Sequence, residues 1–137
     1  MTEVPNLTLL GRQVKGPVRK LEVIPLTHEA EVTMTIPSFT SRCPVTAQPD
    51  YASIQISFLG RATVETKSLK LYLESYRDEG VFGETFTNLL ADDLWAALSP
   101  TWLKVETEWA PRGGISIRAR TCRPVPLSTG APATPVG

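Results

Sequence analysis

The sequence predicts an α+β fold in which a four-stranded antiparallel sheet carries two helices on one face. The predicted elements follow the order strand, strand, helix, helix, strand, strand. Each predicted strand alternates apolar and polar residues, and each predicted helix has a single apolar stripe. Strands with one apolar face form antiparallel sheets, and helices cover that face to complete the core.

The first two strands are expected at 31–36 and 51–60, where apolar residues alternate with polar ones. The apolar positions are Val32, Met34 and Ile36 in the first strand, and Ala52, Ile54, Ile56 and Phe58 in the second. The intervening segment 38–50 is rich in proline and small polar residues, so we expect a loop there. Residues 1–18 show no sustained period and are expected to form an irregular N-terminal arm.

The apolar period then becomes that of a helix, first over 67–77 and again over 85–98. The first stripe is Leu69, Tyr72, Leu73 and Tyr76, and the second is Phe86, Leu89, Leu90, Leu94, Ala97 and Leu98. Thr85 is the expected N-cap of the second helix, and Pro100 is expected to end it.

Two further strands are expected at 101–110 and 113–121, joined by a turn at 111–114. Their apolar faces are Leu103, Val105, Thr107 and Trp109, then Ile115, Ile117 and Ala119. We therefore expect one domain over 19–122, followed by a disordered tail over 123–137 that is rich in Pro, Ala, Thr and Ser. The sheet edges of such a subunit are exposed, which favours a homo-oligomer.

The composition is that of one small globular domain. The chain has 137 residues, of which 42% are hydrophobic and 20% are charged. Fourteen basic and fourteen acidic residues give no net charge, so nucleic acid is not expected as the main partner. The sequence shows neither a membrane span nor a signal peptide, so the expected location is cytoplasmic. Cys43 and Cys122 are expected to be reduced thiols, and with the single histidine, His28, they offer no metal cluster.

Cys43 and Asp50 stand near the two ends of a short proline-stiffened segment, SRCPVTAQPD. A cysteine on a loop can be a packing residue, a redox sensor or a nucleophile. The polar loop favours the nucleophile, because Arg42 can stabilise the thiolate and Asp50 can accept or deliver a proton if the loop folds back. No Cys-His pair of the protease kind is expected, since His28 precedes the first strand.

Four segments, taken together, point to a known family. They are LTLLG (7–11), SRCPVTAQPDYASIQIS (41–57), ETKSLKLYLESYR (65–77) and PRGGISI (111–117). In order and spacing they resemble segments of the NADPH-dependent 7-cyano-7-deazaguanine reductases, the nitrile reductases of queuosine biosynthesis, a tRNA modification. The second segment resembles that family's nucleophile segment, and the third its signature helix, which is linked to NADPH binding.

The resemblance implies a tunnelling fold, with subunits in pentameric rings that can stack as a decamer and active sites between subunits. It also implies the chemistry. Cys43 would add to the nitrile carbon to give a covalent thioimide, Asp50 would donate a proton, and two NADPH molecules would supply hydrides in turn. The product would be 7-aminomethyl-7-deazaguanine.

The resemblance also implies binding residues. Glu65, Lys67, Ser68 and Lys70 would bind the cofactor together with Arg112 and Gly113, while Glu84 and Ser68 would bind substrate. A carboxylate such as Glu84 suits a guanine-like ring, because it accepts two N–H donors along one edge. From the residues alone, a solvated helix face is the preferred interpretation of the lysines, and a favourable charge at a helix N-terminus is the preferred interpretation of Glu84. Arg112 could equally decorate a hairpin turn.

The chain departs from the family at two positions. In the signature helix it has Thr66, where the family usually has Ser or Leu. The other departure lies in a binding motif. Where the family has Phe-His-Glu, this chain has Phe82, Gly83 and Glu84. A glycine is expected to enlarge the pocket and loosen the loop. Two alternatives stay open beside the reductase: an amidinotransferase-like relative in which ammonia attacks the same thioimide on a modified nucleic acid, and a non-catalytic protein that binds a deazapurine or pterin ring.

Overall fold

The computed structural model describes Leu7 and residues 19–125. The elements are β1 (Val23–Arg42), β2 (Pro49–Val64), α1 (Thr66–Glu74), α2 (Gly83–Leu98), β3 (Trp102–Arg112) and β4 (Ile115–Arg123). The predicted α+β order is confirmed. The expected arm at 1–18 and tail at 123–137 lie outside the described residues, except for Leu7 and 123–125. Neither helix in the described part could cross a bilayer, given its length and polarity.

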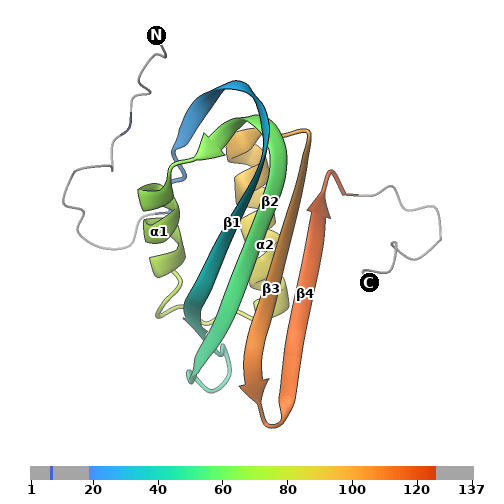
Figure 1. The fold of residues 1–137 in the computed structure, drawn as a ribbon. Helices are drawn as coiled ribbons and strands as arrows, with labels where there is room; N and C mark the ends of the chain where they lie inside the picture. The colour runs from blue at the N-terminus through green and yellow to red at the C-terminus, as the bar shows by residue number, and fades with distance from the viewer. Residues whose placement is uncertain (1–6, 8–18, 126–137) are drawn as a thin grey trace, which may run out of the picture.

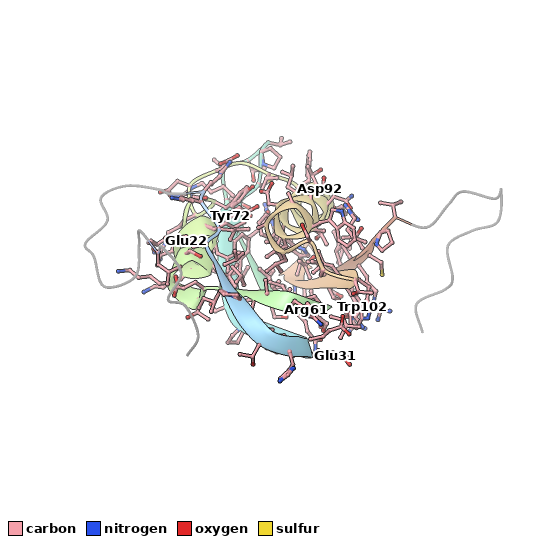
Figure 2. All side chains as sticks on the ribbon, turned by 90° about the horizontal axis from the view of Figure 1, so that it is seen from above. Glu22, Glu31, Arg61, Tyr72, Asp92 and Trp102 are labelled. Atoms are coloured by element: carbon pink, nitrogen blue, oxygen red, sulfur yellow. The ribbon has the colours of Figure 1, made fainter. Side chains whose placement is uncertain are left out.

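The four strands form one sheet in the order β1-β2-β3-β4, and every neighbouring pair is antiparallel. Both helices lie on the same side of this sheet (Figure 1). Seen from above, Tyr72 on α1 and Asp92 on α2 mark the two helices beside each other over that face (Figure 2). The architecture is therefore two layers, with β1 and β4 as free edges in the single chain.

The core lies between the helices and the central strands. The predicted apolar faces of β2 and β3 are buried: Ala52, Ile54, Ile56 and Phe58 on one strand and Leu103, Val105, Thr107 and Trp109 on the other. The predicted stripe Leu69, Tyr72, Leu73 and Tyr76 is also buried against them, although α1 ends at Glu74 and Tyr76 lies in the turn that follows. The apolar residues predicted from the strand period of 2 and from the helix period of 3.6 therefore pack into the same core, one set from the sheet and the other from the helices.

The first two strands are longer than the sequence indicated. β1 continues through Ser38–Arg42, which was expected to be loop, because Phe39 pairs with Ala52 and Ser41 pairs with Asp50. A register shift between Ile36 and Phe39, next to Pro37, interrupts the alternation and hid this part of the strand. The loop before β2 is therefore only 43–48.

The second helix and last strand also differ from expectation. The α2 helix begins at Gly83 with Phe82 as its N-cap, so Thr85 lies inside the first turn rather than capping it. Leu89 is 40% exposed, and Ala91 is buried on the core stripe instead. The predicted apolar face of β4 is largely uncovered, and Cys122 near the end of this strand is an exposed free thiol. The strand ends at Arg123, one residue beyond the expected domain boundary at 122.

Adjacent leucines on α2 give a direct test of this core. Leu90 is fully buried whereas Leu89 is exposed. We expect Leu90→Ala to lower the free energy of unfolding by about 2–5 kcal/mol, because it removes buried methyl groups and leaves a cavity. Leu89→Ala should change it by less than about 1 kcal/mol. Urea unfolding of both variants measures the difference, and equal losses would mean that the α2 stripe is wrongly assigned.

Candidate functional site

Three connections meet at one end of the sheet: the loop 43–48 between β1 and β2, the connector 75–82 between the helices, and the β3–β4 hairpin (Figure 1). The sequence-predicted Cys43, Asp50, Glu84 and Arg112 all come from these connections or the residues beside them. This end of the sheet is the candidate active site.

The loop that carries Cys43 is closed by its own backbone. The Cys43 N–H donates to the Gln48 carbonyl at 2.8 Å, and the Ala47 N–H donates to the Cys43 carbonyl at 2.9 Å. Ala47 has a φ of 60°, a left-handed conformation that a residue with a Cβ adopts only when its surroundings hold it there. The loop folds back on itself, which is the condition for Asp50 to act beside the thiol, and Cys43 and Asp50 line the same cavity.

The helix connector is bonded to the end of β1. The Arg42 N–H donates to the Glu79 carbonyl, and the Val81 N–H donates to the Arg42 carbonyl, both at 3.0 Å. Gly80 lies so close to the cysteine loop that a Cβ there would stand 2.9 Å from the Cα of Pro44. This contact brings the start of α2 against the loop, and Glu84 with it.

Arg112 joins the hairpin to the cysteine loop. One guanidinium nitrogen donates to Asp50 Oδ1 at 2.6 Å, and the other donates to Thr46 Oγ1 at 3.1 Å and to Gln48 Oε1 at 2.7 Å. The ion pair with Asp50 raises the pKa of Arg112, so the guanidinium stays charged. A single side chain therefore fixes three positions of the loop and orients the carboxylate.

Hydrogen bonds to the sulfur lower the pKa of Cys43 to about 7. The largest cause is the Thr46 side chain, followed by the backbone of Thr46 and Val45, with a smaller part from Arg112. The sequence suggested Arg42 for this role, but Arg42 instead bonds Asp78 and the carbonyl of Ala47. A substantial fraction of Cys43 is thus thiolate near neutral pH.

Cys43 opens onto a cavity of about 270 Å³, which we call the cysteine cavity. Its walls come from Cys43 and Asp50, from Phe82, Gly83 and Glu84 at the start of α2, and from Trp109, Arg112, Ile115 and Ile117 of the hairpin. This volume is at the small end of ligand sites, as suits one bicyclic ring. Glu84 lies at this cavity with no hydrogen-bond or ion-pair partner among the described residues.

Gly83 does not enlarge the cavity, contrary to expectation. A Cβ at this position would lie 2.5 Å from Cε2 of Trp109 and 2.6 Å from its Nε1, so the indole already fills the space. The expected loosening is also absent, because Gly83 is the first residue of α2 and its carbonyl accepts a hydrogen bond from Thr87 Oγ1 at 2.8 Å.

The predicted signature residues lie on α1, apart from the cysteine cavity. Glu65 caps the helix, with its two carboxylate oxygens accepting the N–H groups of Lys67 and Ser68. The Ser68 hydroxyl is buried between the carbonyl of Glu65 and the N–H of Glu22. In the single chain these two side chains serve the start of the helix, and their cofactor role stays a prediction.

A second cavity, of about 550 Å³, runs between α1 and β1 and is lined by Lys70. It shares no lining residue with the cysteine cavity. Lys70 is exposed there and has no partner among the described residues. Gly113 lies in the hairpin turn at a φ of 58° with nothing near its Cα hydrogens. The structure thus groups the predicted residues into two separate surfaces of one chain.

His28 is exposed in the irregular part of β1 between Pro25 and Ala30, where this strand pairs with the C-terminal end of β2. Within the chain it lies at the opposite end of the sheet from Cys43. Sequence analysis missed Thr46, as well as the cavity roles of Trp109, Ile115 and Ile117. Nothing in the sequence around Thr46 marks it as a site residue. The apolar face predicted for the last strand was expected to be covered by the helices, so Ile115 and Ile117 were not recognised as a cavity wall.

Known proteins give an independent comparison. The QueF-like protein family matches residues 49–125, over half of the chain. The NADPH-dependent 7-cyano-7-deazaguanine reductase of Syntrophus aciditrophicus (strain SB) is 51% identical over 119 residues, covering 84% of each chain. The reductase of the same name from Frankia casuarinae is 45% identical over 115 residues, covering 82% of this chain and 92% of that one.

The fold is matched as well. The crystal structure of an archaeosine synthase QueF-Like in the apo form aligns with a TM-score of 0.59 over 69% of this chain and 91% of that one, at 19% identity. At that identity the likeness concerns the fold alone. The family match includes β2 and the β3–β4 hairpin, and the match to the Syntrophus reductase covers 84% of this chain. On these sequence matches, the chain belongs to the QueF-like protein family.

Proposed function

We propose that the chain reduces the nitrile of 7-cyano-7-deazaguanine to 7-aminomethyl-7-deazaguanine with NADPH. One observation carries the proposal: a cysteine with a pKa of about 7 shares a small cavity with a carboxylate, and both contact the same arginine. The names of the relatives, at 51% and 45% identity, supply the substrate and the cofactor. A cytoplasmic location belongs to the same proposal.

In the proposed chemistry, the Cys43 sulfur attacks the nitrile carbon and forms a C–S bond. The thiol proton passes to Asp50 and from there to the nitrile nitrogen, so that the thioimide contains every atom of the substrate. Arg112 holds Asp50 beside the sulfur, and the hydrogen bonds from Thr46 keep the sulfur nucleophilic. Glu84, unpartnered at the cavity, accepts the N–H donors of the guanine-like edge.

NADPH fits the α1 surface better than the cysteine cavity. The groove beside Lys70 is twice as large, with about 550 Å³ against about 270 Å³, and Lys70 is free to meet a phosphate. Lys67 and Lys70 would hold the cofactor's phosphates, with Glu65 and Ser68 shaping the helix start. When bound, the cofactor supplies the hydrides of the reduction. Arg112 and Gly113 of the hairpin remain part of the proposed cofactor contact.

The proposal includes assembly into pentameric rings, alone or stacked as a decamer, with active sites between subunits. The uncovered edges β1 and β4 support it, as do Ile115 and Ile117, which are exposed beside the cysteine cavity at 68% and 39%. The Lys70 groove and the cysteine cavity share no residue within a chain. For cofactor and substrate to meet, the proposed assembly has to place the Lys70 groove of one subunit beside the cysteine cavity of another.

Intact-protein mass spectrometry tests the chemistry. On mixing with 7-cyano-7-deazaguanine, we expect an adduct equal to the mass of the substrate, because addition to a nitrile expels nothing. The adduct should be absent in Cys43→Ala and unchanged in Cys122→Ala, whose thiol is exposed on β4. Adding NADPH should remove the adduct and release the amine.

The other outcomes separate the alternatives. An adduct that persists with NADPH but yields an amidine with ammonia would favour the amidinotransferase-like reading and contradict the reductase. A complex without any covalent adduct would favour a ring-binding protein. An adduct that survives in Cys43→Ala would assign the nucleophile to another residue.

The pKa of Cys43 predicts the pH dependence of its reactivity. In a Cys122→Ser background, alkylation of Cys43 by iodoacetamide should speed up about tenfold between about pH 6 and about pH 8, with a midpoint at the pKa of about 7. Thr46→Ala should move this midpoint upward, because it removes the strongest hydrogen bond to the thiolate.

Thr40→Ala is the matched control, since the Thr40 hydroxyl contacts the carbonyl of Ser41 rather than the sulfur. Its midpoint should stay at that of the parent. Alkylation rates measured by peptide mass spectrometry across the pH range decide the point, and an unshifted midpoint in Thr46→Ala would contradict the assigned cause.

A further inference from the structure

We propose that Trp109 is the specificity-determining wall of the cysteine cavity, and that its indole takes the space which a side chain at position 83 would occupy. This inference rests on the proposed function for its substrate, a planar bicyclic ring with an aminopyrimidinone edge. In this proposal, Trp109 and Gly83 act as a matched pair and together shape the cavity beside Glu84.

The indole is held by a chain of hydrogen bonds. Trp109 Nε1–H donates to Thr107 Oγ1 at 2.9 Å, and Thr107 Oγ1 lies 2.7 Å from Thr87 Oγ1. Thr87 in turn donates to the carbonyl of Gly83 at 2.8 Å. With Thr107 donating to Thr87, each hydroxyl in this buried chain gives one hydrogen bond and receives one. The chain therefore ties the indole to the first residue of α2 in one arrangement.

Aromatic packing fixes the ring from the other sides. The rings of Phe39 and Phe86 stand nearly perpendicular to the indole, at 86° and 88°, with centroids 6.0 and 6.3 Å away. Such edge-to-face contacts are specific in geometry as well as favourable. Trp109 is only 7% exposed, and it is one of the residues that line the cavity. Its cavity-facing surface is thus rigid, apolar and unable to titrate.

Gly83 is the other half of the pair. A Cβ at 83 would lie within 2.9 Å of three indole atoms, so any larger residue must push the ring out of its hydrogen bond to Thr107. Position 83 therefore adds no side chain to the cavity wall, and the indole of Trp109 occupies the space that such a side chain would take. Trp109, Cys43 and Glu84 all line this cavity. In this proposal, the distance of the indole from Cys43 and Glu84 sets the size of the substrate ring that the cavity accepts.

The steric half of the proposal is tested by stability. Gly83→Ala normally costs nothing in a first helical turn, but here we expect Tm to fall by roughly 5–10 °C because the indole is displaced. Trp109→Phe should lower Tm moderately, and in that background Gly83→Ala should cause little or no further loss. Additive losses in the double variant, measured by calorimetry, would overturn the pairing.

The specificity half is tested by binding, in a Cys43→Ala background that prevents adduct formation. The probes are 7-cyano-7-deazaguanine and pterin, a larger bicyclic ring with the same aminopyrimidinone edge. We expect Trp109→Ala, or Trp109→Phe if the alanine variant does not fold, to narrow the preference for the smaller ring by about tenfold. Trp102→Phe, at the other end of β3, is the matched control and should leave it unchanged.

If the role of Trp109 is purely structural, its variants will have a lower Tm but an unchanged ratio of the dissociation constants for the two rings. That result would overturn the assignment. If the parent binds neither ring, the proposed function fails and the specificity role fails with it, whereas the stability cycle still reports on the steric pairing. Gly83→His gives a last check: we expect its reductase rate to fall below the parent, and a rise would mean that the cavity has room for an imidazole.

Discussion

The backbone of Arg42 is the constraint on which the site depends. Its N–H and C=O are bonded to Glu79 and Val81, at the point where β1 ends and the cysteine loop begins. Together with the close approach of Gly80 to Pro44, these two bonds fix the connector between the helices to the end of the sheet. With them, the nucleophile loop, the first turn of α2 and the hairpin become neighbours, although they are far apart in sequence.

Charge then organises what the backbone has assembled. Arg112 reaches from the hairpin to three side chains of the loop and its flank, and one of these is the carboxylate of Asp50. The same guanidinium contributes to the lowered pKa of Cys43. A cation that serves the thiolate and the carboxylate together keeps both negative groups in a small volume, where alone they would repel each other. The cavity is thereby prepared before substrate arrives.

The sequence was most informative where the evidence is local. Alternation along β2 and β3 predicted their buried faces, because a strand exposes its period directly in consecutive residues. Cys43 and Asp50 could be paired from the sequence for the same reason, since they lie only seven residues apart, and the structure places both at one cavity. The end of β1 was missed because a register shift breaks its alternation. Thr85 was taken for the N-cap because its side chain is of the capping type. The N-cap is defined by backbone angles, and the residue with those angles is Phe82.

Long-range contacts were beyond this kind of prediction. Nothing near Arg42 in sequence reveals that its charge is engaged by Asp78, or that Thr46 bonds the sulfur. The effect of Gly83 was predicted with the wrong sign, because a glycine suggests an empty space only when its neighbours in three dimensions are unknown. Here the neighbour is Trp109, which comes from another strand and leaves no space at all.

The contact between Gly83 and Trp109 also means that the two positions cannot be varied independently. A chain with glycine at 83 and a smaller ring at 109 carries only a void, which a protein tolerates at modest cost. A chain with tryptophan at 109 and a side chain at 83 must house two groups in one space. When both positions are exchanged in one protein, Trp109 therefore has to be replaced before a side chain is introduced at 83. The reverse order passes through a variant in which two groups compete for one space, so the two positions behave as a single unit of sequence.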